Sequence, residues 1–351
     1  MHRRPPWRIP LALVVAVILA LLVVALVPAW RDEALTTALL LTGQIGAPRD
    51  RRTVALCAST RRGLGAWLAR RIVVPRGRVV AGTIAGAALH GARRPYYAYL
   101  PPGYNLPIFR HRRYPVVYLL HGAPGTAHDW YWGGAINVVA DRLIADCLMV
   151  PMILVMPDGN GGLTRDSQYV NRWNGTENDE TYIVRDVVGF VDRHYRTLRD
   201  PRFRAIMGLS EGGYGAANLT VRNPDVFGAA AALTGYFRAD PHEALFWDNP
   251  FDHDVRMMRT NSPILRVATL PPAIRHHLHV FLYDGANDGA YAPRARAFLR
   301  QLTRCGVPSY WDSRVTEPTG VLYHTWTYWR DSARDALIRL SALFLAERAQ
   351  A

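Results

Sequence analysis

The stretch Phe203-Arg204-Ala205-Ile206-Met207-Gly208-Leu209-Ser210-Glu211-Gly212-Gly213 places a serine between an apolar run and a run of small residues. The apolar run follows Asp200-Pro201 and predicts a buried strand, whereas 213–221 predicts a helix that Asn223-Pro224 ends. Gly-x-Ser-x-Gly at such a strand-to-helix turn is a nucleophile elbow, in which glycines make room for a serine on a strained backbone. The pattern predicts Ser210 as a catalytic nucleophile, with an ordinary serine in a glycine-rich turn as the alternative.

A catalytic serine needs a base, and in an elbow-type site an acid and then a histidine follow the serine along the chain. The only histidine beyond residue 279 is His324, which lies between an expected last strand and the C-terminal helix. This position predicts His324 as the base that takes the proton of Ser210. The alternative is a core histidine bonded to a backbone carbonyl.

The loop Asp284-Gly285-Ala286-Asn287-Asp288 follows an apolar run and contains the candidate acids. Catalytic groups of open parallel sheets gather at the carboxyl ends of the strands. Asp288 is preferred, because a loop of several residues is needed to bring a carboxylate across to the histidine. Asp284 is the second choice, since an Asp before Gly often only makes a turn. Asp312 and Glu317 rank lower.

Stabilising a tetrahedral oxyanion requires two donors, which are usually backbone amides. The amide of Glu211, directly after the nucleophile, is expected to be one. The other is expected after the apolar run 116–120, where Gly122 allows a sharp turn that points the amide of Ala123 into the site. Gly122 itself is the second choice, and His121 either contacts substrate or orients this loop.

Several segments together resemble the Putative esterase family of α/β-hydrolases, which includes esterase D or S-formylglutathione hydrolase, feruloyl and acetylxylan esterases, and mycolyltransferases. The resemblance extends over about residues 78–345. The segments are Tyr99-Leu100-Pro101-Pro102-Gly103-Tyr104, Leu119-Leu120-His121-Gly122, Met156-Pro157-Asp158-Gly159, Gly208 to Ala216, Asn223-Pro224-Asp225-Val226-Phe227 and His324-Thr325-Trp326.

By matching position, the resemblance implies a nucleophile, an acid, a base and two oxyanion amides, which are Ser210, Asp288, His324, Ala123 and Glu211. Relatives commonly carry Met, Gln or another uncharged residue where this chain has Glu211. Its carboxylate would disfavour anionic substrates or pair with an arginine.

Further residues of these segments are candidates for the substrate pocket: His121, Gly122, Trp130, Asp158 and Tyr214. Trp130 begins the aromatic run Trp130-Tyr131-Trp132, which suits a lipidic or carbohydrate substrate. The proline-punctuated segment 236–275 is expected to form a wall or lid of the acyl pocket, or a plain surface excursion.

Apolar runs alternate with helical patterns along the catalytic region. Strands are predicted near 78–85, 96–100, 116–120, 152–156, 203–208, 229–233, 279–283 and 309–315. Helices are predicted near 135–146, 179–195, 213–221, 292–304 and 331–348. This alternation predicts an α/β fold with a mostly parallel central sheet and helices on both faces, and the resemblance specifies it as the α/β-hydrolase fold.

An apolar segment precedes this domain. Ile9 to Val27 has no charged or polar side chain, and about 20 apolar residues span a bilayer. The run exceeds the usual signal-peptide core of about 7 to 15 residues, which favours an uncleaved transmembrane anchor at 9–29 over a signal sequence. Arginines precede it, so we expect residues 1–8 in the cytoplasm and the catalytic domain, 72–351, outside it.

Positive charge is concentrated in the connecting segment 30–71 and its flanks. The chain has a net charge of +14 and contains no lysine, and residues up to Arg78 account for +10 of that charge. The segment is expected to be a basic tether, either an amphipathic helix on anionic lipid or a solvated linker. No nucleic-acid-binding module accompanies the charge, so nucleic acid is not an expected partner.

The three cysteines do not form a disulfide framework, and Cys147 and Cys305 are interpreted as buried thiols. No Cys-His cluster has the spacing of metal ligands, so neither a metal nor a cofactor is expected.

The sequence therefore predicts a membrane-tethered extracytoplasmic serine esterase acting on an acyl or aryl ester. The alternative is an acyltransferase of the mycolyltransferase kind, which moves an acyl chain to a sugar hydroxyl through the same catalytic groups. A third possibility is a non-catalytic protein that kept the fold, which the complete set of catalytic groups argues against.

Overall fold

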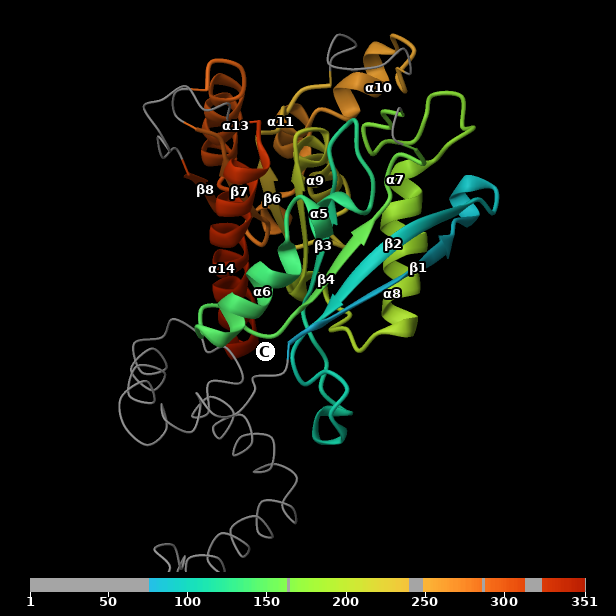
Figure 1. Cartoon of the computed structure of the whole chain (residues 1–351). Coiled ribbons are helices and arrows are strands. Elements are labelled where there is room, and N and C mark those ends of the chain that lie inside the picture. Colours follow the sequence, from blue (N-terminus) through green and yellow to red (C-terminus); the bar gives the residue numbers. More distant parts are fainter. Residues whose placement is uncertain (1–75, 163–164, 240–248, 286–287, 313–323, 351) are drawn as a thin grey trace, which may run out of the picture.

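The computed structural model describes residues 76–350 except 163–164, 240–248, 286–287 and 313–323. These residues form an eight-stranded sheet with helices on both faces (Figure 1). The predicted segments 1–8, 9–29 and 30–71 lie outside the described residues. In the part of the chain that is described, no helix has both the length and the apolar character that crossing a bilayer requires.

The sheet is mostly parallel, as predicted. Its strands are β1 (Arg78–Ala85), β2 (Arg93–Leu100), β3 (Val116–Leu120), β4 (Ile153–Pro157), β5 (Arg204–Leu209), β6 (Ala229–Leu233), β7 (His279–Tyr283) and β8 (Ser309–Asp312). They lie in the order β1-β2-β4-β3-β5-β6-β7-β8. The pairs β1 with β2 and β2 with β4 are antiparallel, and the other neighbouring pairs are parallel.

The strand β5 lies between β3 and β6 in the interior of the sheet. Leu120 of β3 pairs with Gly208 of β5, and Leu233 of β6 pairs with Leu209. All residues of these three strands are buried, because helices cover both faces of a parallel sheet. The carboxyl ends of β3, β5 and β6 therefore meet at one edge, where the nucleophile is predicted.

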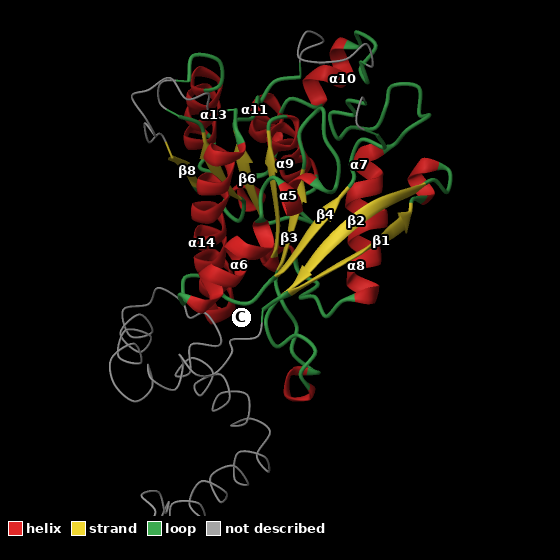
Figure 2. Ribbon diagram, viewed as in Figure 1, coloured by secondary structure: helices red, strands yellow, loops and turns green. Residues whose placement is uncertain are grey.

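Helices form a layer on each face of the sheet (Figure 2). They are α5 (Asp129–Trp132), α6 (Ile136–Ala145), α7 (Asp179–Thr181), α8 (Val188–His194), α9 (Glu211–Arg222), α10 (Val255–Thr260), α11 (Pro263–Arg266), α12 (Pro272–Arg275), α13 (Ala292–Arg304) and α14 (Trp326–Gln350). A π-helical turn, Tyr182–Val187, joins α7 to α8. The core on one face contains side chains of α6 and α14, such as Ile144 and Leu337. The cores on the other face contain side chains of α8, α9 and α13.

The cysteines differ in part from the expectation. Cys305 is a buried free thiol, as predicted. Cys147 is disulfide-bonded, so its interpretation as a thiol is wrong. Disulfide pairing depends on which cysteines the tertiary structure brings together, which spacing along the sequence does not reveal.

Candidate active site

Ser210 occupies the turn between β5 and α9. Its φ of 55° and ψ of −121° put a non-glycine residue in a strained backbone conformation. The amide of Ser210 donates a hydrogen bond of 2.8 Å to the carbonyl of Leu233, which fixes the turn to the end of β6. The local geometry is that of the predicted nucleophile elbow, because the strained turn lifts the serine side chain away from the strand.

Close backbone packing around the turn explains the glycines of the motif. A Cβ at Gly208 would lie 2.0 Å from the carbonyl oxygen of Gly212, and a Cβ at Gly212 would lie 2.5 Å from the carbonyl oxygen of His121. A Cβ at Gly122 would lie 3.2 Å from the Cβ of Ser210. Strand β5, helix α9 and the loop after β3 can therefore approach this closely only without side chains at these positions.

The structure brings His324 to the serine. The His324 Nε2 lies 2.9 Å from the Ser210 Oγ, a hydrogen-bonding distance. The imidazole stacks on the ring of Tyr291 and meets the edge of Trp329, with ring centroids 4.9 Å apart in both cases. Desolvation lowers the pKa of His324, and the charge of Asp288 acts in the opposite direction. A neutral imidazole at this position can accept the serine proton.

The candidate acids have different surroundings. One Asp288 carboxylate oxygen accepts hydrogen bonds of 2.9 Å from the amides of Ala290 and Tyr291, and the hydrogen bonds of the described residues include none between Asp288 and His324. Asp284 is fully buried, and neither of its carboxyl oxygens has a hydrogen-bond partner in the described residues. Burial, and then the charge of Asp288, raise the pKa of Asp284 well above its usual value.

The charge of Asp288 therefore acts on His324, whereas burial disfavours the charged form of Asp284. Asp312 ends β8 and is buried, and Glu317 lies outside the described residues.

The predicted oxyanion amides belong to residues next in the chain to Ser210 and to Gly122, which lies against Ser210. Glu211 is the first residue of α9, and Ala123 follows Gly122 on the loop after β3. The amides of Ala123 and Glu211 donate to no acceptor among the described residues. Backbone amides without partners are the kind of donor that a developing oxyanion requires.

Four predicted pocket residues are buried side chains that stabilise the fold. They are His121, Trp130, Asp158 and Tyr214. The Trp130 indole donates to the Leu120 carbonyl, and the Tyr214 hydroxyl donates to the Asn261 carbonyl. Gly122 is also buried and lies against Ser210.

His121 orients its loop through both ring nitrogens. Burial lowers the pKa of His121, which favours the neutral ring. The Nδ1 lies 2.8 Å from the Gly122 carbonyl oxygen, to which it donates, and the Nε2 accepts from the Gly159 amide at 3.0 Å. These contacts are those of the loop-orienting alternative rather than of a substrate contact.

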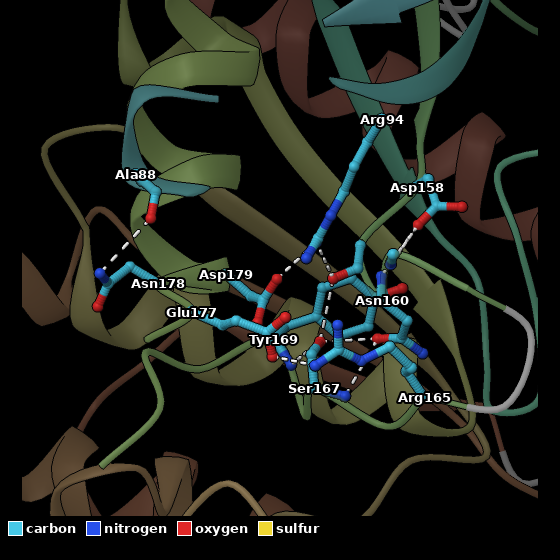
Figure 3. A network of polar contacts seen from close by, with 12 residues as sticks. Ala88, Arg94, Asp158, Asn160, Arg165, Ser167, Tyr169, Glu177, Asn178 and Asp179 are labelled. Carbon is cyan, nitrogen blue, oxygen red and sulfur yellow. Dashed lines mark hydrogen bonds and ion pairs between the residues drawn. The ribbon is translucent and has the colours of Figure 1, made fainter. Parts of the chain in front are cut away.

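A polar network that sequence patterns did not indicate surrounds the segment after β4 (Figure 3). Hydrogen bonds from Gly159 and Tyr169 connect it to His121. The Arg94 guanidinium donates to the Gly159 carbonyl and forms an ion pair with Asp179. The Ser167 hydroxyl bonds both the Gly159 carbonyl and Asn160, and the Tyr169 hydroxyl donates to the His121 carbonyl. Burial raises the pKa of Asp179 to about 6 despite the opposing effect of Arg94.

The described residues contain no group of three or more His, Cys, Asp or Glu side chains that could hold a metal ion.

A serine on a strand-to-helix turn of a mostly parallel sheet, with a histidine nitrogen at its hydroxyl, is the arrangement of a serine hydrolase with an α/β-hydrolase-like fold. The family described as Putative esterase matches residues 87–340. The chain belongs to this family, which confirms the resemblance found in the sequence.

The chain matches only part of the length of its curated relatives. The chain is 34% identical over 139 residues to an endo-1,4-beta-xylanase/feruloyl esterase of Xylanibacter ruminicola, covering 39% of this chain and 19% of that protein. It is 31% identical over 143 residues to an esterase of Mycobacterium tuberculosis, covering 39% of this chain and 29% of that protein. The matching region thus spans about a fifth to a third of these relatives.

Solved structures share the fold over most of the described chain. A ferulic acid esterase superimposes with a TM-score of 0.66 at 26% identity, covering 76% of this chain and 99% of that one. The fluorophosphonate-binding serine hydrolase F of Staphylococcus aureus has a TM-score of 0.62 at 18% identity, with the same coverage, which shows a common fold alone.

Proposed function

We propose that this chain is a serine esterase in which Ser210 attacks the carbonyl carbon of a carboxylic ester. The observation that carries the proposal is the 2.9 Å contact between His324 Nε2 and Ser210 Oγ at a strained strand-to-helix turn. His324 takes the serine proton, and the amides of Ala123 and Glu211 bind the oxyanion. His324 then gives the proton to the leaving alcohol, and water releases the acid from the acyl-enzyme. The negative charge of Asp288 stabilises the imidazolium.

The proposed substrate is an acyl or aryl ester, including a hydroxycinnamoyl ester of a carbohydrate. The support is the similarity to an endo-1,4-beta-xylanase/feruloyl esterase at 34% identity and to a ferulic acid esterase structure at 26% identity.

The proposed location is outside the cytoplasm, with residues 9–29 as a membrane anchor and 30–71 as a basic tether. The apolar run and the preceding arginines support this topology. The disulfide at Cys147 supports an oxidising compartment.

The test uses the full chain and its Ser210→Ala variant, with a fluorophosphonate probe, p-nitrophenyl esters of graded chain length and methyl ferulate. We expect the probe to label only the wild-type chain and kcat to fall on the order of 10⁶-fold in the variant. Ser309→Ala is the matched control, because this serine lies on β8 and should label as the wild type does. Labelling that persists in Ser210→Ala would contradict the assignment.

A second arm adds sugar acceptors to the wild-type reaction. Release of free acid as the main product supports the esterase. Diversion of the acyl group to the sugar would instead indicate an acyltransferase.

A further inference from the structure

An exposed apolar turn lies on the 105–113 loop, which is part of the connection between β2 and β3. Leu106, Pro107 and Ile108 are consecutive exposed residues at a 3₁₀ turn, Pro107–Phe109. The side chains of Leu106 and Ile108 are 42% and 41% exposed. Contact with water is unfavourable for aliphatic groups, and an exposed apolar group with a polar rim marks a surface that binds a protein or a membrane.

Positive charge surrounds this turn. The connection 101–115 has three arginines and no acidic residue, and Arg110, His111 and Arg113 are exposed. Arg110 donates to the His111 ring, and Arg113 donates to the Thr197 carbonyl. Neither arginine forms an ion pair within the described ranges of the chain. Their charge is therefore available to an anionic partner.

The chain enters the described domain at the same surface. Arg76 is the first described residue, and the predicted anchor at 9–29 precedes it in the sequence. Arg76 and Arg78 are exposed and line a hollow of about 220 Å³ together with Leu106. The start of the domain therefore adds two positive charges beside the apolar turn.

The loop is held in place by contacts with a neighbouring segment. The Arg196 guanidinium lies 3.8 Å from the centroid of the Tyr104 ring, and it donates to the carbonyls of Tyr104 and Arg112. The Tyr114 amide donates to the Arg196 carbonyl at 2.8 Å, and the Phe109 side chain is buried. Because the loop is already ordered, binding through it costs little conformational entropy.

This surface lies at the opposite end of the sheet from Ser210. The loop precedes β3, whereas Ser210 follows β5, and the two strands are parallel. The loop before β3 is at the lower end of the sheet in Figure 1, and α10 is at the upper end. Strand β3 alone, with five residues at about 3.3 Å each, adds roughly 17 Å between the two ends.

We propose that the 105–113 loop docks on the anionic surface of a lipid bilayer and turns Ser210 away from it. Leu106 and Ile108 enter the interfacial region, and the exposed arginines lie against the phosphates of the headgroups. The proposal rests on the proposed membrane location. Its consequence for the proposed esterase is that the site meets esters outside the bilayer rather than acyl chains within it.

The test measures hydrogen–deuterium exchange of the full chain on two kinds of vesicle, phosphatidylcholine alone and phosphatidylcholine with phosphatidylglycerol. Exchange in 105–113 should slow on the order of tenfold on the anionic vesicles, whereas α10 should exchange equally on both. Retention of the chain on the zwitterionic vesicles reports the anchor, and the difference between the two lipids reports docking. Failure of the membrane location and failure of docking are therefore distinguishable.

Two variants remove parts of the docking surface. Arg110→Gln/Arg113→Gln should weaken docking about 25-fold, at about fivefold for each arginine near anionic lipid. Ile108→Asp should abolish the protection of 105–113, because it replaces an apolar contact with a negative charge. Both variants should unfold at the urea concentration of the wild type, since these side chains are exposed.

Matched controls make the same changes on α10. They are Arg256→Gln/Arg259→Gln and Val255→Asp, where both arginines are exposed and Val255 is 64% exposed. Both controls should keep the protection of 105–113. Equal exchange in 105–113 on the two kinds of vesicle would overturn the proposal, and so would protection of α10 in its place. Protection that appears without lipid as the protein concentration rises would also overturn it, by assigning the surface to a second copy of the chain.

Discussion

The two halves of the candidate site are built in different ways. On the nucleophile side, Ser210 is 6% exposed and lies between an interior strand and α9, where a Cβ at Gly208 would lie 2.0 Å from a backbone oxygen. On the base side, His324 is exposed and packs between the rings of Tyr291 and Trp329. A Cβ at Gly289, next to Asp288, would meet no atom within 4 Å.

Backbone packing therefore fixes the nucleophile, whereas side-chain rings and a short turn hold the base and the acid. The nucleophile side should lose stability when it is altered, because close-packed backbone cannot yield. The base side should lose activity with little change in stability, because exposed positions contribute less to folding.

The largest expected effect is that of His324→Ala. Removing the base should lower kcat on the order of 10⁶-fold, because Ser210 then has no group to take its proton. The free energy of unfolding should change by less than about 1 kcal/mol, since the side chain is exposed. Steady-state kinetics and urea unfolding measure the two quantities. A variant as active as the wild type within tenfold would contradict the role of His324.

The next prediction compares substitutions of two aspartates in one loop, Asp288 and Asp284. Asp288→Asn should lower kcat about 10⁴-fold, because the charge that stabilises the imidazolium is lost. The Asp288 charge raises the pKa of His324, so its removal lowers that pKa further. Because the base must be neutral, the acidic limb of the pH profile should shift to lower pH.

Asp284→Asn is the matched control for this pair. Burial disfavours the charged form of Asp284, so an amide of similar size should leave kcat within about tenfold of the wild type. The assignment of the acid would have to move to Asp284 if this variant lost more activity than Asp288→Asn.

The smallest expected effect is a difference in stability between alanine substitutions of two glycines, Gly212 and Gly289. A Cβ at Gly212 would lie 2.5 Å from the carbonyl oxygens of Leu120 and His121, so Gly212→Ala should destabilise the fold by about 1–3 kcal/mol. Gly289→Ala meets open space and should change stability by less than about 1 kcal/mol. Urea unfolding of both variants measures the difference. Equal losses would mean that packing does not distinguish the two halves of the site.

Much of the fold could be predicted from hydrophobic patterns. The predicted strands at 116–120, 229–233 and 279–283 have the observed bounds, because buried parallel strands are continuous apolar runs between turns. Helix boundaries were less accurate. The last helix begins at Trp326 rather than near 331, since Trp326 packs against Trp130. That contact joins segments far apart in the chain.

The segment 236–275 is a second region whose structure hydrophobic patterns did not predict. The sequence indicated only a wall, a lid or a surface excursion there, whereas the described part contains the short helices α10, α11 and α12. Helices of four to six residues have too few turns to show a hydrophobic period.

The sequence by itself determined the elbow, the single downstream histidine and the alternation of strands and helices. These features are local, since each depends on residues within a few positions of one another. The tertiary structure decided that His324 lies 2.9 Å from Ser210, that Asp284 is buried, and that His121 supports its loop. Burial and the approach of distant segments determine these properties, because the environment of a side chain depends on the whole fold.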